Sequence, residues 1–557
     1  MVARTQHANS RALKTASGSL AQSGGTTIGR APSDERSVPH HPFSPNPPPG
    51  AALPPSPPSL VTERDRLPPT IAVAPGDGIG PEITAAVLRI LSAACPDLRH
   101  EQVILGESAY RRGVNSGISP EAWATIRRHR VLLKAPVTTP QGGGFKSVNV
   151  TLRKSLGLFA NVRPCPTYHP YVPTLHPGMD VVIVRENEED TYGGIEYLQT
   201  AEVAQCLKLI SRPGSERIVR YAFAYARAHG RRKVTCLTKD NIMKRTDGLF
   251  HRVFDEVRRE YPDIEAEHLI VDIGTARLAT VPQNFDVVVT LNLYGDILSD
   301  VVAQISGSVG LAGSANIGPE CAMFEAVHGS APDIAGRGIA NPSGLLMAAV
   351  LLLVHIGRPE EATRLHNAWL RTIEDGVHTA DIANERTTRE RVGTAAFAEA
   401  VVARLGTRPQ HLPPALYAAP DAEAFRLALA PPTAAHRPAK SFHGVDVFLD
   451  WSPADGLRDP ERLARDLGPA TPAPFRLAMI SNRGTRVWPD GFPETFCTDH
   501  WRCRFLLPEP DEGVEKVGAR VSTLLAALGA AGLETIKTEN LYAFDGVAAY
   551  TAADKGE

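Results

Sequence analysis

The stretch TLNLYGDILSD at residues 290–300 constrains this chain more than any other, because it sets two acids at a helical spacing directly after an apolar run. Residues 287–291 read as a buried strand, and the chain is predicted to turn at Gly295 into a helix. Asp296 and Asp300 then lie on one helical face. Two carboxylates at this spacing repel by roughly a few tenths of a kcal/mol, and the pair becomes favourable when a hard divalent cation binds both.

An isolated DxxxD pattern is more often a solvated helix face than a metal site. Two features favour the metal here. Asp272, in IVDIGTARL, lies one short unit upstream and offers a third carboxylate ligand. Basic residues elsewhere match an anionic substrate. The sequence therefore predicts a divalent-cation site formed by Asp272, Asp296 and Asp300.

Composition limits the class of protein. At 557 residues and 43% hydrophobic, the chain can bury large cores and form more than two domains. Its 59 basic and 61 acidic residues leave a formal charge of −2, so no bulk positive field indicates nucleic acid or an anionic membrane. The seven cysteines are never in CxxC spacing, which fits a reducing compartment. The longest apolar run, 345–354, is shorter than the roughly 20 residues of a membrane span and reads as a buried helix.

Residues 1–69 differ from the rest, because Ser, Gly and Ala dominate first and Pro afterwards. We expect disorder, since this composition buries too little apolar surface to offset its ordering entropy. The first thirty-three residues hold Arg4, Arg11, Lys14 and Arg30 and no acid, the bias of an organellar transit peptide. An untargeted tail and a start codon placed too far upstream remain equal alternatives.

Order is predicted to begin at Thr70. IAVAPGDGIGPEITAAVLRIL gives a short strand, a glycine-rich turn and a helix opened by Pro81 and Glu82. The glycines at 76, 78 and 80 do not match GxGxxG, so this segment is a tight strand-to-helix connection near a site, not a dinucleotide fingerprint.

A cluster of polar and basic residues follows the predicted strand 131–134. The loop APVTTPQGGGFKSVNV and a helix over TLRKSLGLFANVRP carry Ser147, Asn149, Arg153 and Arg163, and Arg185 ends the strand DVVIVRENEED. Arginine binds carboxylates through paired N–H donors. Each residue alone is more often a surface group beside an acid, and only their combination favours a small molecule with several carboxylates.

Tyr192, in EDTYGGIEY, and Lys239, in VTCLTKDNIMK, are the candidates for proton transfer. Arginines and a metal lower the pKa of a nearby lysine, and a tyrosine hydroxyl relays a proton to carbon. Spacing alone does not separate these roles from a lysine at the end of a strand and a tyrosine in a core.

The loop EAVHGSAPDIAGRGIANPSG, rich in Gly and Pro, places His328, Gly329 and Asp333 close together in the sequence. Such a loop suits a ribose and an adenine. An acid at 333 accepts ribose hydroxyls and repels a 2′-phosphate, which favours NAD. The alternative is an ordinary surface loop.

From about Thr70 to Gly406, the chain resembles the metal-dependent decarboxylating dehydrogenases, which include isocitrate and 3-isopropylmalate dehydrogenases. Six blocks in order carry the resemblance: APGDGIGPE, LRKSLGLFANVRP, VVIVRENEEDTYGGIE, TKDNIMK, NLYGDILSD and EAVHGSAPDIAGRGIANPSG. The pair Ser147 and Asn149 is similar to isocitrate enzymes, not to isopropylmalate ones. The segment from GVDVFL to YAFDG resembles the long, bacterial-type isocitrate dehydrogenase subgroup.

The resemblance implies a role for each matched residue. Mg²⁺ or Mn²⁺ would be held by Asp296 and Asp300 of one subunit and Asp272 of its neighbour, which also supplies Lys239, so the minimum unit is a homodimer. Lys239 would manage the hydroxyl proton and Tyr192 would protonate carbon. The isocitrate carboxylates would be bound by Arg153, Arg163, Arg185, Ser147 and Asn149. The coenzyme would be bound by Thr139, Glu325, His328, Gly329, Ala331, Asp333, Ile334 and Asn341.

The coenzyme is where the resemblance and the residues conflict. NADP-using relatives show Lys-Tyr where this chain has Asp333 and Ile334, and several carry a further Tyr and Arg downstream. Here Ala380 replaces that tyrosine, and Arg386 is the one possible phosphate partner. We therefore expect NAD⁺, with NADP⁺ as the alternative that the subgroup resemblance favours.

The implied fold class is α/β: a two-part catalytic unit of this family, not a GxGxxG Rossmann fold, at residues 70–430. The larger part covers about 70–165 and 307–430, and the smaller about 166–306. A linker at 431–440 leads to a C-terminal α+β domain at 441–557, whose predicted strand and helix order is compatible with a split βαβ, ferredoxin-like sandwich.

The function expected is therefore oxidative decarboxylation of isocitrate to 2-oxoglutarate, as in the tricarboxylic acid cycle. Homoisocitrate, isopropylmalate and tartrate are rival substrates. A non-catalytic regulatory subunit is the rival class, although such a copy would be expected to lose at least one of Tyr192, Lys239 and the three aspartates. The cytoplasm is the expected location, or the mitochondrial matrix if residues 1–69 are a transit peptide, with no nucleic-acid or membrane partner.

Overall fold

The computed structural model describes residues 70–138, 147–419, 422–430, 437–511 and 516–551. The expectation of disorder at 1–69, the coenzyme residue Thr139 and most of the linker at 431–440 lie outside these residues.

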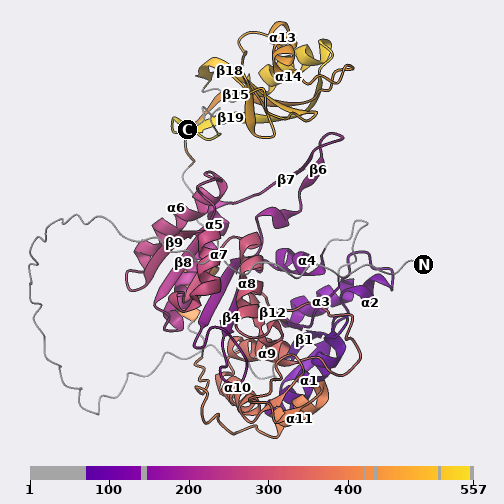
Figure 1. Ribbon diagram of the computed structural model, residues 1–557, viewed down its shortest axis with the longest axis vertical. Coiled ribbons are helices and arrows are strands. Elements are labelled where there is room, and N and C mark those ends of the chain that lie inside the picture. Colours follow the sequence, from indigo (N-terminus) through magenta and orange to yellow (C-terminus); the bar gives the residue numbers. More distant parts are fainter. Residues whose placement is uncertain (1–69, 139–146, 420–421, 431–436, 512–515, 552–557) are drawn as a thin grey trace, which may run out of the picture. The chain divides into compact units, whose positions relative to one another are not determined.

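A mixed sheet of ten strands forms the centre of the catalytic unit within the described residues (Figure 1). Its order is β2-β1-β3-β12-β11-β4-β5-β10-β8-β9, and β11 is antiparallel to both neighbours, as is β4. The strands are β1 (Thr70–Ala74), β2 (Arg99–Gln102), β3 (Val131–Lys134), β4 (Ala160–Pro166), β5 (Asp180–Glu186), β8 (Lys233–Thr238), β9 (Glu265–Ile270), β10 (Val287–Thr290), β11 (Gly313–Ile317) and β12 (Ala322–Ala326).

Helices cover both faces of this sheet, which explains why its strands are nearly continuous apolar runs. On β1, Ile71 and Val73 join one core cluster, while Ala72 and Ala74 join another on the opposite face. The first face packs on α1 (Gly80–Ala94), α5 (Arg212–Ala228), α6 (Thr246–Val257), α9 (Ser343–His355), α10 (Pro359–Glu374) and α11 (Thr394–Val402). The second packs on α3 (Pro120–His129), α4 (Val148–Ser155), α7 (Val271–Thr280) and α8 (Asn292–Ile305).

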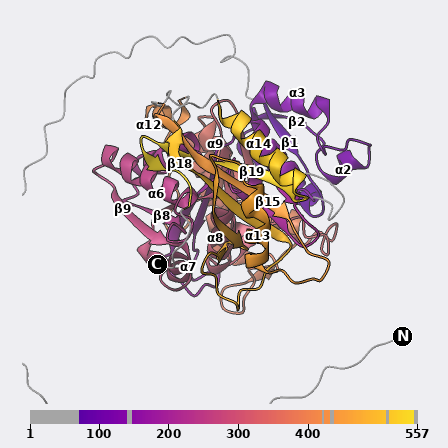
Figure 2. The same cartoon turned by 90° about the horizontal axis from the view of Figure 1, so that it is seen from above.

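Smaller elements complete the unit. These are α2 (Glu107–Tyr110), α12 (Ala422–Leu429), the pair β13 (Val377–His378) and β14 (Glu390–Arg391), and the hairpin β6 (Glu196–Leu198) and β7 (Ala204–Cys206). Figure 2 shows β9 at the outer edge beside β8, with α6 next to them.

Most predicted elements form as expected, and two do not. The helix predicted over residues 151–164 is α4, which ends at Ser155. Gly157 then adopts a positive φ of 62°, and β4 starts at Ala160. The helix predicted to start at Gly295 begins at Asn292, so Gly295 lies in the first turn of α8. A Cβ at Gly295 would be 2.5 Å from Cγ of Arg185. This glycine therefore serves close packing, not a turn.

The C-terminal domain is a separate six-stranded antiparallel sheet, of order β17-β16-β18-β15-β19-β20. Its elements are β15 (Lys440–Asp450), α13 (Pro460–Ala470), β16 (Arg476–Asn482), β17 (Thr485–Trp488), β18 (His500–Asp511), α14 (Val517–Ala530), β19 (Glu534–Phe544) and β20 (Val547–Ala548). Both helices share one apolar core with the sheet. Without the edge strands β17 and β20, the order is βαββαβ, which agrees with the predicted split βαβ fold.

Among the described residues, every helix is too short or too polar to span a bilayer.

Candidate active site

A polar cavity of about 330 Å³ opens where several elements of the catalytic unit meet. Lys134 ends β3, Glu325 lies near the end of β12, α4 contributes Asn149, Val150 and Arg153, and α8 contributes Asp296 and Asp300. The predicted residues that line it are Ser147, Asn149, Arg153, Arg163, Arg185, Tyr192, Asp296, Asp300, Glu325, His328 and Gly329. Segments more than a hundred residues apart in the sequence thus converge on one cavity.

Two buried arginines form the most basic part of this cavity. Arg185 donates from Nη1 to Oδ1 of Asp296 at 2.5 Å and from Nε to the carbonyl of Asn292 at 2.9 Å. Arg163 donates to the hydroxyl of Ser299 at 2.5 Å and lies 3.5 Å from both Asp296 and Asp300. Burial, followed by repulsion from Arg153 and Arg163, lowers the pKa of Arg185 to about 9. An anionic ligand would therefore be strongly attracted here.

A buried carboxylate joins a third arginine to a lysine. Glu325 accepts from Nζ of Lys134 at 2.8 Å and from Nη2 of Arg153 at 2.9 Å. Burial alone would raise the pKa of Glu325, but the two cations outweigh it and hold that pKa well below its usual range. The expected coenzyme residue Glu325 thus orients Lys134 and Arg153 at the cavity wall.

Tyr192 and Asp296 face each other across the cavity. The Tyr192 hydroxyl donates to Oδ2 of Asp296 at 2.5 Å, and the Arg185 guanidinium lies 4.9 Å from the centre of the tyrosine ring. Burial and then the hydrogen bond to Asp296 raise the pKa of Tyr192. The phenol is therefore held protonated, as a proton donor to carbon must be.

Three buried polar atoms of the cavity have no hydrogen-bond partner. They are Oδ1 of Asn149, Nε of Arg153 and Nε2 of His328. Leaving such atoms unpaired costs about 1–3 kcal/mol each. They fit a polar ligand that bridges the arginine side of the cavity and the loop after β12.

Within one chain, only two of the three predicted metal-binding acids lie where they could bind a hard divalent cation together. Asp296 and Asp300 face the cavity from α8, and carboxylate oxygens suit Mg²⁺ or Mn²⁺. Burial raises the pKa of Asp300, whereas Arg185 and Tyr192 outweigh burial and lower that of Asp296. Asp272 does not line the cavity; it accepts from Nζ of Lys239 at 2.9 Å in the first turn of α7. Two of the three predicted ligands are brought together, and the third pairs with the predicted lysine.

The predicted adenosine loop follows β12 and is exposed at Asp333. Nδ1 of His328 lies 3.0 Å from the carbonyl of Gly329, and Ala331 has a positive φ of 38°. Asn341 is already engaged, because its amide donates to Asp381 at 2.9 Å and its carbonyl caps Ser343. The loop is tied to α1 by Glu82, whose carboxylate accepts from the backbone N–H groups at 338 and 340, both at 3.1 Å.

Two other residues that were expected to contact the coenzyme already make contacts within the chain. Ile334 packs against the main core cluster with only part of its side chain exposed. Arg386, the candidate phosphate partner, donates to the carbonyl of Pro170 at 3.3 Å. In the same loop, Gly329 and Ala331 would contact a ligand through their backbone, and the exposed side chain of Asp333 would contribute a negative charge.

Sequence reasoning missed Lys134, a fully buried cation of the cavity. The sequence feature from which Lys134 could have been identified is its place at the end of the apolar run VLLK, directly before a glycine-rich loop. It also missed the amide network in which Asn161 binds Arg163 at 2.7 Å and Asn316 at 2.8 Å. Isolated asparagines in strands carry no pattern from which such pairing is predictable.

Comparison with known proteins gives two family matches. Residues 70–401 match the family described as isocitrate/isopropylmalate dehydrogenase, and residues 440–557 match the C-terminal domain of bacterial isocitrate dehydrogenase.

Individual relatives cover most of the chain. The isocitrate dehydrogenase [NADP] of Rickettsia felis is 52% identical over 485 residues, which are 87% of this chain and 98% of that protein. The isocitrate dehydrogenase [NADP] of Thermus thermophilus is 44% identical over 493 residues, 87% of this chain and 95% of that protein. A crystal structure of the TT0538 protein from Thermus thermophilus superposes with a TM-score of 0.79 at 43% identity, covering 86% of this chain and 95% of that chain.

Proposed function

The chain belongs to the isocitrate/isopropylmalate dehydrogenase family and carries the C-terminal domain of its bacterial isocitrate enzymes, and from this premise we propose oxidative decarboxylation of isocitrate, with NADP⁺ as the coenzyme that its relatives favour. The observation that carries the substrate is the cavity, in which three arginines and Lys134 surround three carboxylates, and three buried polar atoms have no partner. A tricarboxylate matches this surplus of positive charge.

The arginines position the substrate in this proposal. Arg163 and Arg185 now hold Asp296, and the substrate carboxylates would take over those guanidinium donors. Asn149, with its unpaired Oδ1, and Ser147, at the start of α4, suit the carboxylate and hydroxyl groups at the other end. Binding would then release Asp296 to face a cation.

A divalent cation bound by Asp296 and Asp300 would polarise the 2-hydroxyl and its adjacent carboxylate. The chain's own residues then handle protons. Tyr192, held protonated, donates to the carbon that loses CO₂, and Lys239 removes the proton of the 2-hydroxyl.

We propose that Lys239 and Asp272 serve the cavity of a second copy of this chain. They form an ion pair of 2.9 Å, and neither lines the cavity of their own chain. The hairpin β6–β7 supports such pairing, because the large apolar side chains of Tyr197 and Leu198 on it are exposed by 52% and 75%. A homodimer is the smallest assembly in which each cavity is complete.

One observation favours NAD⁺ as a second candidate. Asp333 is exposed on the predicted adenosine loop. A carboxylate there accepts hydrogen bonds from ribose and repels a 2′-phosphate. The printed names of the two relatives support NADP⁺ more directly than this single side chain supports NAD⁺.

Steady-state assays of the purified chain with Mg²⁺ test the substrate and the coenzyme together. We expect turnover with isocitrate to exceed turnover with homoisocitrate and 3-isopropylmalate by at least about tenfold in kcat/KM. No turnover of isocitrate with either coenzyme would contradict the proposed function, and a higher kcat/KM for NAD⁺ than for NADP⁺ would replace the proposed coenzyme by the second candidate.

Replacement of Asp333 tests whether this residue contacts the coenzyme. The test is valid whether the wild type prefers NAD⁺ or NADP⁺. Asp333→Lys exchanges repulsion of a 2′-phosphate for attraction, so the ratio of kcat/KM for NADP⁺ to that for NAD⁺ should rise by at least about tenfold. The matched control is Asp466→Lys on α13, which makes the same charge change in the C-terminal domain and should leave the ratio unchanged. An unchanged ratio in Asp333→Lys would remove Asp333 from the coenzyme site.

A further inference from the structure

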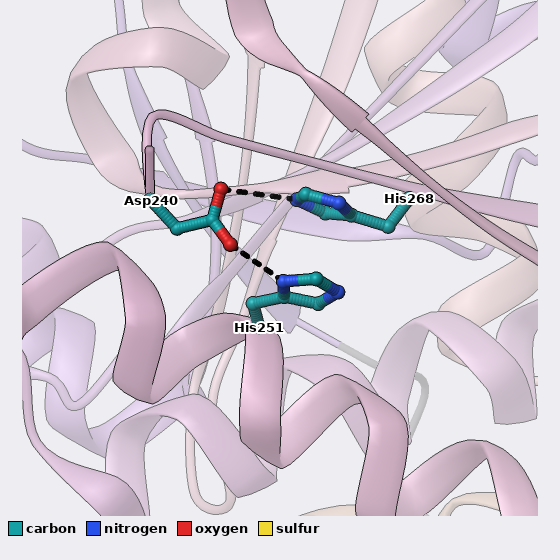
Figure 3. Close-up of side chains that lie close together, drawn as sticks. All are labelled: Asp240, His251 and His268. Atoms are coloured by element: carbon teal, nitrogen blue, oxygen red, sulfur yellow. Dashed lines mark hydrogen bonds and ion pairs between the residues drawn. The ribbon is translucent and has the colours of Figure 1, made fainter. Parts of the chain in front are cut away.

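Two histidines and an aspartate from three separate elements gather behind the catalytic lysine (Figure 3). Asp240 follows β8, His251 lies on α6 and His268 on β9. Nδ1 of His251 lies 2.7 Å from Oδ2 of Asp240, and Nε2 of His268 lies 3.9 Å from Oδ1. The two imidazole rings stack with centroids 3.5 Å apart, and both present a nitrogen to the same carboxylate.

The protonation states suit metal binding. Burial and then the neighbouring His251 lower the pKa of His268, which favours its neutral imidazole. Burial would raise the pKa of Asp240, but the hydrogen bond with His251 and the nearby imidazoles outweigh it and lower that pKa. A neutral imidazole and an ionised carboxylate are the forms that bind a metal ion.

The surroundings also orient the ligands. Asp255 lies 3.6 Å from the other ring nitrogen of His251, the place where metal-binding histidines usually meet a carboxylate. The Thr238 hydroxyl lies 2.8 Å from Nε2 of His268, the nitrogen that also faces Asp240, so a bound ion would take the place of this hydrogen bond. The side chains are one-fifth to one-quarter exposed, so an ion has access from solvent.

We propose that Asp240, His251 and His268 bind one transition-metal ion of the Zn²⁺ class per chain, apart from the acidic site at Asp296 and Asp300. Their ligand atoms all lie within 4.8 Å of one another. Tetrahedral Zn²⁺ requires separations of about 3.3 Å, which small rotations of the side chains supply. Two imidazoles and one carboxylate select Zn²⁺ over Mg²⁺, because Mg²⁺ prefers oxygen ligands alone.

The position gives the ion a consequence for the enzyme. Asp240 is the residue after Lys239. His268 lies on β9, the strand next to β8, and precedes Asp272 in the sequence by four residues. A bound ion would join the ends of β8 and β9 with α6 and restrain the Lys239–Asp272 pair. The concentration of a transition metal would thus determine how rigidly Lys239 and Asp272 are held. These are the residues that we assign to the second subunit's cavity.

The test is equilibrium dialysis of the full chain against Zn²⁺ in a large excess of Mg²⁺, which occupies the acidic site. We expect one Zn²⁺ per chain and a rise in Tm on addition of Zn²⁺. His251→Gln and His268→Gln should each weaken Zn²⁺ binding at least about tenfold. His411→Gln, which alters an exposed histidine elsewhere, is the matched control and should bind like wild type.

Co²⁺ in place of Zn²⁺ reports the ligands directly. Imidazole coordination of low symmetry gives stronger visible absorption than six oxygen ligands, and this absorption should disappear in both variants. Zn²⁺ binding by wild type that is no stronger than by the two variants would overturn the proposal, as would a Co²⁺ spectrum of oxygen coordination only. Neither readout requires turnover, so the result is independent of the proposed reaction.

Discussion

Asp296 is the acid of the cavity that two arginines share with the proposed proton donor. Arg185, Arg163 and Tyr192 all converge on its carboxylate, which thereby occupies the place where substrate carboxylates would bind. Because one carboxylate cannot satisfy two guanidiniums, a phenol and a cation together, substrate binding must redistribute these partners.

Removal of the Tyr192 hydroxyl should abolish proton donation to carbon without loss of substrate binding. Tyr192→Phe should lower kcat by roughly 10²–10⁴-fold, the usual contribution of a general acid, while KM for isocitrate changes far less. Steady-state kinetics measure both. Tyr542→Phe, on β19 of the C-terminal domain, is the control and should keep the wild-type kcat. Equal kcat values for the two variants would exclude Tyr192 as the donor.

Glu325 should stabilise the fold by compensating two buried cations. Glu325→Gln leaves Lys134 and Arg153 without a counter-charge, which should lower the free energy of unfolding by about 3–5 kcal/mol. Urea unfolding measures this loss. Glu385→Gln, at an exposed position, should change it little.

The pH dependence of the same residue follows from its depressed pKa. A carboxyl whose pKa is lower in the folded state contributes stability above its unfolded pKa, and the contribution is lost as pH falls below that value. Wild-type stability should therefore decrease on acidification below about pH 4.5, and Glu325→Gln should show a shallower decrease. Parallel pH curves for the two proteins would contradict this assignment.

At the scale of the element, α8 brings the acids to the arginines because its first turn is unusually close to β5. Gly295 permits this approach, since a Cβ there would lie 2.5 Å from Arg185. Gly295→Ala should displace Arg185 and lower kcat/KM for isocitrate by up to about 10²-fold.

Gly248→Ala on α6 is the matched control for this helix substitution. Its Cβ would meet only the flexible end of Arg252, at 3.3 Å. Alanine favours a helix by about 1 kcal/mol over glycine, so this variant should be as stable as wild type or more so, and fully active. Full activity of Gly295→Ala would show that the close approach has no part in the site.

Local pattern predicts the elements that bury an apolar face. The strands at 131–134 and 287–290, the helix α9 and the βαββαβ order of the C-terminal domain all follow from apolar periodicity and turn residues. The pattern is wrong at α4 because leucines at 156 and 158 continue an apparent helix, while Gly157 ends it and β4 pairs with β5 and β11. Tertiary pairing decides such boundaries.

The residue types of the candidate site are predictable from the sequence, but the pairs that these side chains form with one another are not. Arginines, acids and Tyr192 stand out because their types match a carboxylate and metal chemistry. The bridge from Lys134 through Glu325 to Arg153 joins β3, β12 and α4, which sheet order alone brings together. The Asp240, His251 and His268 cluster is hidden for the same reason.

At the scale of the whole molecule, the separation of Lys239 and Asp272 from their own cavity is the decisive feature. All three arginines, Tyr192 and two acids line one cavity, while the proposed base and the third acid pair elsewhere. In the proposed twofold dimer, the same surface of each chain lies against the other, so each cavity would receive the pair from its partner.

Complementation between two inactive variants measures that exchange most directly. Lys239→Met and Asp300→Asn each disable a different half of the shared site and should be nearly inactive alone. When the two are coexpressed, half of the dimers are mixed by chance, and each mixed dimer has one intact site, so about a quarter of wild-type activity should return. Activity of the coexpressed pair no higher than that of either variant alone, with mixed dimers isolated, would contradict a shared site.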